Sequence, residues 1–151
     1  DTRKTTPGFR VLEKWAVRLG GGHNHRMGLY DMVMLKDNHI DFAGGIVPAV
    51  AQVRQYLKVQ QKELAIEVET RNIQEVHEAL AAEVDRIMLD NFDIATTKEA
   101  VALIGGRCEV ESSGGITEHT LVSFAECGVD YISVGALTHH IKGVDMSLKA
   151  L

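Results

Sequence analysis

The sequence predicts an α/β fold with a parallel sheet, because short β-branched segments alternate with segments of helical period along most of the chain. The connections between these segments are short, and strand–helix–strand units of this kind join parallel strands through right-handed crossovers. Such a sheet closes into a TIM-like barrel with the helices outside, or it stays open and doubly wound. The alternation alone is compatible with both.

Five strands are expected from runs of apolar and β-branched residues, over residues 33–36, 64–69, 86–90, 109–112 and 131–134. Between them, apolar residues recur at helical spacing and predict helices near residues 46–57, 73–80, 94–104 and 121–125. An earlier helix is expected over residues 11–19 and should end at the glycines 20–22.

The number of strands is small for a complete barrel. Eight strand–helix units take about 250 residues, whereas this chain has 151. The first predicted helix follows residues 1–8 with no complete strand before it. We therefore expect one domain, residues 1–151, that is a fragment of a longer chain and lacks the first strand of its sheet.

Charge is distributed unevenly along the chain. The net charge is −5, which argues against a nucleic-acid partner. Residues 1–36 nevertheless hold seven Lys or Arg residues and only three acidic ones. A basic segment on an acidic protein fits a pocket for a small, multiply charged anion, although a solvated basic helix face is the alternative.

Other classes of protein are disfavoured by composition. No apolar run approaches the roughly 20 residues of a membrane span, and no signal peptide opens the sequence. Cys108 and Cys127 have no Cys or His partner at metal-ligand spacing. These features predict a cytoplasmic protein without a membrane partner and without a zinc site.

Residues capable of chemistry follow each predicted strand. In parallel α/β folds the carboxyl ends of the strands form the ligand crevice. Five separate stretches should therefore converge on one site, and the residues at their ends are Lys36, Glu69, Asp90, Ser113 and Gly135.

Two of these strand ends resemble parts of a phosphate site. Residues 112–117, Ser-Ser-Gly-Gly-Ile-Thr, precede a helix expected to begin near Glu118. Glycines let the backbone approach an anion, and N–H groups at a helix start donate to it. The alternative is an ordinary turn with Thr117 as the N-cap. Residues 135–138 lie where barrels place the other half of such a site.

Glu69 and Asp90 end neighbouring strands, where carboxylates can hold Mg²⁺ and sugar hydroxyls or stabilise positive charge on a sugar. The alternatives are that Glu67 or Glu69 is solvated at a strand edge and that Asp90 is an N-cap. His25 lies beside Arg26 within the basic segment, which favours a role in anion binding.

Several long motifs resemble the quinolinate phosphoribosyltransferase family, also called nicotinate-nucleotide pyrophosphorylase (carboxylating). The resemblance begins with Asp-Thr-Arg-Lys-Thr-Thr-Pro-Gly at residues 1–8 and continues at residues 20–29 and 35–40. It extends through residues 67–69, 88–91, 111–116 and 134–139, so that it covers nearly the whole chain.

The resemblance implies a barrel fold and an activity. The family transfers phosphoribosyl from phosphoribosyl pyrophosphate to quinolinate with Mg²⁺, giving nicotinate mononucleotide, pyrophosphate and CO₂ in NAD biosynthesis. It also implies roles for individual residues. The residues that would bind quinolinate are Arg3, Lys4, His25 and Arg26. The catalytic residues would be Lys36, Glu69 and Asp90, of which the two acids would also meet the metal, directly or through water. The residues around the phosphates would be Ser113, Gly114, Gly115, Gly135 and His139.

The family also has an N-terminal domain that this sequence does not contain, and in the family's dimers that domain covers the partner's site. The resemblance therefore implies a homodimer or higher oligomer for the longer protein and little activity for residues 1–151 alone. Two other functions remain as alternatives. One is a homologue of the same fold acting on another acceptor, and the other is a non-catalytic phosphate-binding barrel module.

Overall fold

The predicted alternation of strands and helices is confirmed over Arg26–Val134. A computed structural model describes residues 1–150 and divides the chain into two compact bodies. The larger body, Arg26–Val134, contains the sheet and most of the helices. The smaller body joins Asp1–His25 to the segment that starts at Gly135.

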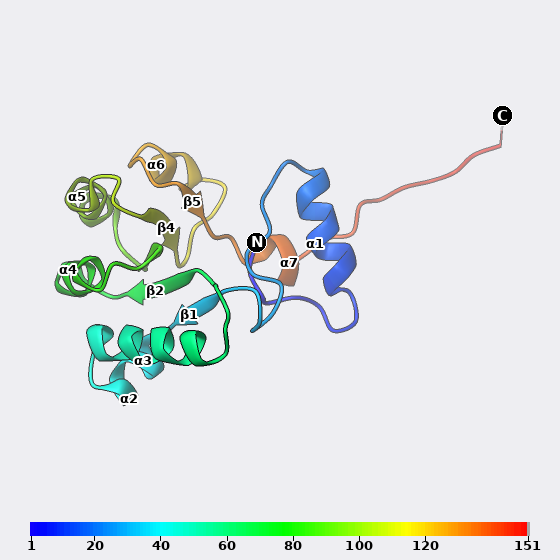
Figure 1. Ribbon diagram of the computed structural model, residues 1–151. Coiled ribbons are helices and arrows are strands. Elements are labelled where there is room, and N and C mark those ends of the chain that lie inside the picture. Colours follow the sequence, from blue (N-terminus) through cyan, green and yellow to red (C-terminus); the bar gives the residue numbers. More distant parts are fainter. Residues whose placement is uncertain (151) are drawn as a thin grey trace. The chain divides into compact units, whose positions relative to one another are not determined.

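The larger body contains one parallel five-stranded sheet (Figure 1). The strands pair in their order along the chain, each with the next, and every pair is parallel. A doubly wound sheet reverses its strand order at a switch point. This consecutive order is barrel-like and decides between the two predicted arrangements. The strands are β1 (Val33–Leu35), β2 (Ile66–Thr70), β3 (Arg86–Asp90), β4 (Glu109–Ser113) and β5 (Tyr131–Ile132).

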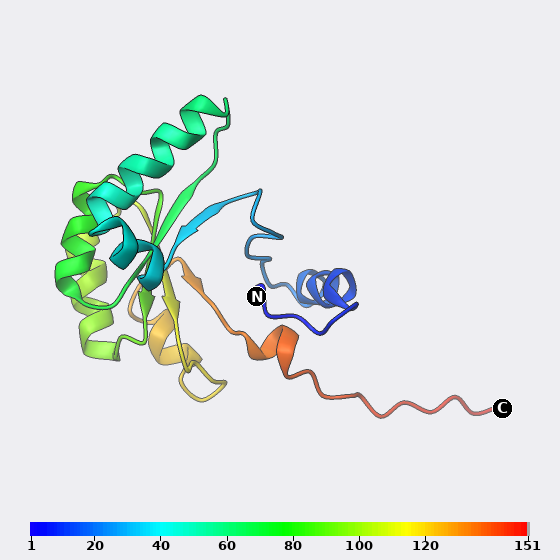
Figure 2. The same cartoon turned by 90° about the horizontal axis from the view of Figure 1, so that it is seen from below.

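The helices pack on one face of the sheet through a shared apolar core (Figure 2). Alternate residues of the strands, such as Val68, Ile87 and Val110, point into this core and meet buried residues of the helices, such as Val76 and Ile104. The helices of this body are α2 (Asp37–Ala43), α3 (Ile46–Val59), α4 (Ile73–Ala81), α5 (Ile94–Ile104) and α6 (Leu121–Ala125).

The smaller body contains helix α1 (Arg10–Leu19) and the short helix α7 (Ala136–His139). The predicted glycine stop of α1 is confirmed. Gly20 and Gly22 donate their N–H groups to the carbonyls of Ala16 and Val17 at 2.9 Å. Gly21 between them has a φ of +84°, a conformation that residues with a Cβ rarely adopt.

Two helices were not predicted. Helix α2 follows β1 directly and buries only Ile40, so the sequence carries almost no helical period there. It ends at Gly44, which has a φ of +83°. The pair Gly44-Gly45 was the one local sequence signal of a helix end there. Helix α7 has four residues, too few for any periodicity.

Four of the five strands differ in extent from the prediction, and two of them, β1 and β4, differ by one residue at their carboxyl ends, Leu35 and Ser113. Strand β2 runs to Thr70 because the Thr70 hydroxyl donates to the Met88 carbonyl at 2.9 Å and ties that residue to β3. Strand β5 is shorter than predicted because β4 ends at Ser113 and the chain then turns away through Gly114 and Gly115.

Candidate functional site

Four predicted site residues lie at the carboxyl ends of neighbouring strands. Lys36 directly follows β1, Glu69 is the penultimate residue of β2, and Asp90 and Ser113 end β3 and β4. Because Asp90 pairs with Ser113 in the sheet register, these two strand ends are level with each other. The parallel sheet thus brings a cation, two carboxylates and a hydroxyl to one edge.

Lys36 and Glu69 form an ion pair. The Lys36 ammonium lies 2.5 Å from a Glu69 carboxylate oxygen, with the lysine side chain 46% exposed and the glutamate side chain 11% exposed. The Lys36 backbone is fixed as well, since its N–H donates to His39 Nδ1 at 3.0 Å where β1 passes into α2. The strand end therefore presents a cation whose partner is the neighbouring carboxylate.

Asp90 is held by the residue after it. The Asn91 amide nitrogen donates to a carboxylate oxygen of Asp90 at 2.8 Å. Asp90 is half-buried at the end of β3, and the N-cap of α5 is Asp93. The alternative that Asp90 is an N-cap is therefore wrong.

The loop after β4 passes through two glycines in left-handed conformations, Gly114 with a φ of +99° and Gly115 with a φ of +62°. Helix α6 begins at Leu121, later than the predicted start near Glu118. Thr117 is not the N-cap, because its N–H donates to the Thr120 hydroxyl and Thr120 occupies the cap position. The extra turn between Gly115 and α6 is stabilised by these two threonines.

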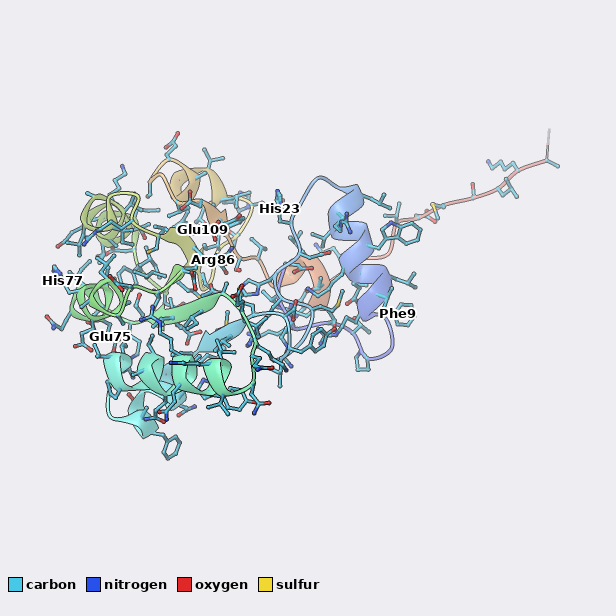
Figure 3. All side chains as sticks on the ribbon, in the orientation of Figure 1. Phe9, His23, Glu75, His77, Arg86 and Glu109 are labelled. Atoms are coloured by element: carbon cyan, nitrogen blue, oxygen red, sulfur yellow. The ribbon has the colours of Figure 1, made fainter. Side chains whose placement is uncertain are left out.

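The face of the sheet opposite the apolar core is charged. Glu67, Arg86 and Glu109 are paired neighbours on β2, β3 and β4 and so share this face. Arg86 bonds Glu109 at 2.7 Å (Figure 3) and approaches Glu111 at 3.4 Å. Its guanidinium also stacks on the Tyr131 ring, 4.3 Å from the centroid.

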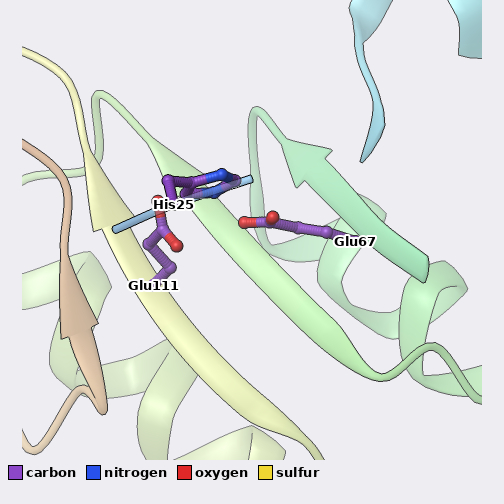
Figure 4. A group of neighbouring side chains, drawn as sticks. All are labelled: His25, Glu67 and Glu111. Atoms are coloured by element: carbon purple, nitrogen blue, oxygen red, sulfur yellow. The ribbon is translucent and has the colours of Figure 1, made fainter. Parts of the chain in front are cut away.

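Glu67 and Glu111 extend toward each other from β2 and β4 (Figure 4). Both are buried, with at most 1% of each residue exposed, and an oxygen of one lies within 4.8 Å of an oxygen of the other. The alternative of a solvated Glu67 is therefore wrong. Glu111 also accepts a short hydrogen bond from the Ser133 hydroxyl. Burial alone would disfavour a charged Arg86, but Glu109, Glu67 and Glu111 together raise the pKa of Arg86.

Sequence reasoning missed this charged layer. The available signal was a charge at every second position, as in Glu67-Val68-Glu69 and Glu109-Val110-Glu111. That pattern indicates a strand with one polar face, and on this face Glu67 and Glu111 are buried whereas Glu109 is exposed.

Arg26 opens the larger body and donates to the Met32 carbonyl at 3.3 Å. The loop between them is closed by Asp31, whose two carboxylate oxygens accept from Met27 N–H at 2.6 Å and Gly28 N–H at 2.8 Å. Slight burial opposes the effect, but these backbone hydrogen bonds and the nearby Arg26 charge lower the pKa of Asp31.

In the smaller body, Asp1 organises the segment that carries His25. Its carboxylate accepts from Lys14 Nζ at 2.9 Å, from the Asn24 amide at 2.7 Å and from the His25 N–H at 2.7 Å. Asp1 and Lys14 are both fully buried. His25 is half-buried, and its carbonyl also accepts from Lys14 at 3.3 Å.

Arg3 and Lys4 lie on the exposed segment that follows Asp1, and the Arg10 side chain donates to the Arg3 carbonyl at 2.9 Å. The Lys4 carbonyl accepts from the Thr138 hydroxyl at 2.8 Å, which connects this segment to α7. Thr138 is fully buried, and sequence reasoning did not single it out.

Gly135 and His139 lie against each other in the same body. A Cβ at Gly135 would come 2.5 Å from His139 Nε2, so the imidazole occupies the space that a side chain would need. These two predicted phosphate residues are thus in contact across the first turn of α7.

The predicted site residues divide between the two bodies. The smaller body holds Arg3, Lys4, His25, Gly135 and His139, and the larger body holds Arg26, Lys36, Glu69, Asp90, Ser113, Gly114 and Gly115. Within residues 1–150, no helix has the length and apolar character that crossing a membrane requires.

The chain matches a family model described as quinolinate phosphoribosyl transferase, C-terminal domain, over residues 1–149. It is 51% identical over 164 residues to the chloroplastic nicotinate-nucleotide pyrophosphorylase [carboxylating] of Arabidopsis thaliana, a match that covers 99% of this chain and 47% of that protein. It is 48% identical over 148 residues to a probable nicotinate-nucleotide pyrophosphorylase [carboxylating] of Bacillus subtilis, covering 98% and 50%. The chain thus spans about half the length of the curated relatives it matches.

Solved structures agree with this match. The crystal structure of NadC from Streptococcus pyogenes aligns with a TM-score of 0.93 and 47% identity, over 99% of this chain and 52% of that one. The nicotinate-nucleotide pyrophosphorylase of Francisella tularensis aligns with a TM-score of 0.92 at 47% identity, over 97% and 51%. The predicted barrel-type parallel α/β fold is confirmed.

Proposed function

Because this chain belongs to the quinolinate phosphoribosyl transferase C-terminal domain family, we propose that the intact protein transfers phosphoribosyl from phosphoribosyl pyrophosphate to quinolinate. The products are nicotinate mononucleotide, pyrophosphate and CO₂, a step of NAD biosynthesis. The observation that carries the proposal is the set of groups at one sheet edge, where Lys36 pairs with Glu69 and Asp90 ends the next strand.

Charge explains the cationic residues. Quinolinate is a dianion and the donor carries several more negative charges, so binding both requires a concentrated positive field. We assign Arg3, Lys4, His25 and Arg26 to the quinolinate carboxylates, since Arg offers a planar pair of donors that matches a carboxylate. Lys36 supplies a point charge toward the pyrophosphate.

The carboxylates act on the ribose. As the bond between the anomeric carbon and pyrophosphate breaks, positive charge develops on the ribose ring, and Glu69 and Asp90 stabilise it. The quinolinate nitrogen forms the new bond to the anomeric carbon. When CO₂ leaves, the electron pair of the broken bond stays on the ring carbon beside the nitrogen, where the pyridinium charge stabilises it, and that carbon then takes a proton from water to give nicotinate mononucleotide.

Mg²⁺ is part of the proposal. The chemistry of the donors fits this ion, since Glu69 and Asp90 offer carboxylate oxygens from the ends of neighbouring strands. These two residues would hold the metal directly or through water. When bound, it neutralises charge on the leaving pyrophosphate.

The phosphate groups are assigned to two loops. Ser113, Gly114 and Gly115 follow β4, and the left-handed glycines keep that backbone open to an anion. Gly135 and His139 supply the second loop. We also propose a homo-oligomeric state and a cytoplasmic location for the intact protein, the latter supported by the unpaired thiols of Cys108 and Cys127.

The test is to incubate the intact protein with quinolinate, phosphoribosyl pyrophosphate and Mg²⁺ and to measure nicotinate mononucleotide. Parallel reactions with nicotinate in place of quinolinate test for a homologue with another acceptor. Product from nicotinate alone would support that alternative, and phosphate binding without any product would support a non-catalytic module. Residues 1–151 alone should give little product in the same assay.

A further inference from the structure

We infer that Asn91 is a positioning residue that connects the proposed ribose carboxylate, Asp90, to the proposed phosphate loop, Ser113–Gly115. The inference rests on the proposed function and extends it to a residue without a role of its own in that chemistry. Three observations from the larger body support it, one for the backbone of Asn91 and two for its side chain.

The first observation is the backbone of Asn91, which has a φ of +56°. Among residues 1–150 the other non-glycine residues with positive φ are Gln61 and Glu83, and both follow the ends of helices, where this conformation is common. Asn91 instead follows a strand at the proposed site. Asn is among the few residues that tolerate this region, and strained backbone often occurs at functional sites.

This conformation lets the Asn91 N–H donate to the Ser113 carbonyl at 2.8 Å. Ser113 is the last residue of β4, so the bond joins the end of β3 to the start of the glycine loop. The height of the loop above the sheet is thereby fixed relative to Asp90.

The second observation is the hydrogen bond to Asp90. The Asn91 amide nitrogen donates to Asp90 Oδ2 at 2.8 Å. This amide donor holds the Asp90 carboxylate in one orientation. The direction of the second carboxylate oxygen, Oδ1, is fixed with it. An Asp at position 91 would keep the shape but replace this donor by a second negative charge.

The third observation is the contact with Gly114. A Cβ on Gly114 would fall on the Asn91 amide, on its oxygen and its carbonyl carbon, and would come 2.9 Å from the Asn91 backbone nitrogen. The Asn91 amide therefore packs against the α-carbon of Gly114. The nitrogen of the same amide orients Asp90. Asn91 sets the position of the phosphate loop and the orientation of the ribose carboxylate together.

The variants Asn91→Gly and Asn91→Asp separate the backbone from the side chain in the intact protein. Asn91→Gly keeps the left-handed backbone and loses both side-chain contacts. The matched control is Glu83→Gly, which also replaces a residue of positive φ, +53°, by glycine. Glu83 precedes the amino end of β3 and is away from the proposed site.

We expect Asn91→Gly and Asn91→Asp to lower kcat/KM for phosphoribosyl pyrophosphate about ten- to a hundredfold, the usual effect of losing a hydrogen bond to a charged group. The KM for quinolinate should change less than about threefold, and the thermal midpoint of Asn91→Gly should stay near that of Glu83→Gly. If Asn91 had a purely structural role, the kinetic constants for both substrates and the thermal midpoint would change together. A value of kcat/KM within twofold of wild type for Asn91→Gly would overturn the inference.

A second measurement keeps this test independent of the proposed function. Pyrophosphate binding, followed by calorimetry, should be weakened at least about fivefold in Asn91→Gly and unchanged in Glu83→Gly. If the wild-type protein binds pyrophosphate but makes no nucleotide, the proposed function fails while the Asn91 inference is decided by this comparison. Equal pyrophosphate affinity in wild type and Asn91→Gly would then overturn it.

Discussion

The ammonium of Lys36 and the carboxylate of Glu69 meet at 2.5 Å across the ends of two neighbouring strands. In the proposed reaction, Lys36 would act on the pyrophosphate and Glu69 on the ribose. Their contact keeps both charges in place before substrate binds. The two residues should therefore act as one unit in catalysis.

Lys36→Met and Glu69→Gln should each lower kcat by about a hundredfold or more, because each removes a charge that acts mainly on the transition state. The double variant should lose less than the product of the two single effects, since the residues are coupled. Steady-state kinetics on the four proteins measures this. Lys58→Met, on the exposed last turn of α3, is the control. Strictly multiplicative effects would show that the ion pair has no catalytic coupling.

Arg3→Ala and Arg26→Ala should each weaken quinolinate binding about ten- to a hundredfold, which corresponds to roughly 1.5–3 kcal/mol for one charge-assisted contact. Replacement by Lys should also be harmful, because the planar pair of donors is lost. Quinolinate titration calorimetry measures the change. Arg54→Ala, an exposed arginine that bonds the Glu83 carbonyl, should leave affinity unchanged. Unaltered affinity in both site variants would rule out this assignment.

Arg86→Met should lower the free energy of unfolding by about 3 kcal/mol, because it removes the guanidinium that pairs with the buried Glu111 and acts electrostatically on the buried Glu67. Urea titration measures the loss, and Arg54→Met serves as the matched exposed control. Arg86→Lys should recover part of the stability by restoring the charge. A loss no larger in Arg86→Met than in the control would mean that the guanidinium does not offset the buried carboxylates.

Asp31 should make stability depend on pH in acid. The pKa of its carboxyl is lower in the folded protein than the ordinary value of about 3.9, so the stabilisation is complete above that value and is lost as pH falls through the folded pKa. The difference in unfolding free energy between wild type and Asp31→Asn should therefore be constant from about pH 5 to 7 and shrink below about pH 4. A difference that stays the same down to pH 3 would contradict this account of the loop.

Much of the fold could be predicted because its signals are periodic and local. Strand β3 and helix α5 were predicted with their observed bounds, since their apolar residues follow strand and helix periods over full elements. Helix α2 was missed because it buries a single residue. The positions of Lys36, Glu69 and Asp90 at strand ends followed from the alternation, because parallel strands bring their carboxyl ends to one edge.

Other features depend on contacts between strands that no local pattern shows. The charged face of the sheet around Arg86 forms only because the strand register aligns Glu67, Arg86 and Glu109. The role inferred for Asn91 requires its positive φ and its contact with Gly114, which come from the geometry of two separate turns. Sequence reasoning could identify the residue types in these places but not their contacts.

The most direct measurement of the central claim is a stoichiometry. The intact protein is mixed with Mg²⁺, phosphoribosyl pyrophosphate and quinolinate labelled in its carboxyl carbons, and CO₂, pyrophosphate and nicotinate mononucleotide are counted in one reaction. We expect one of each per turnover in the wild-type protein and rates lowered together in Glu69→Gln. Pyrophosphate released without CO₂ or nicotinate mononucleotide would contradict the assignment of quinolinate as the acceptor.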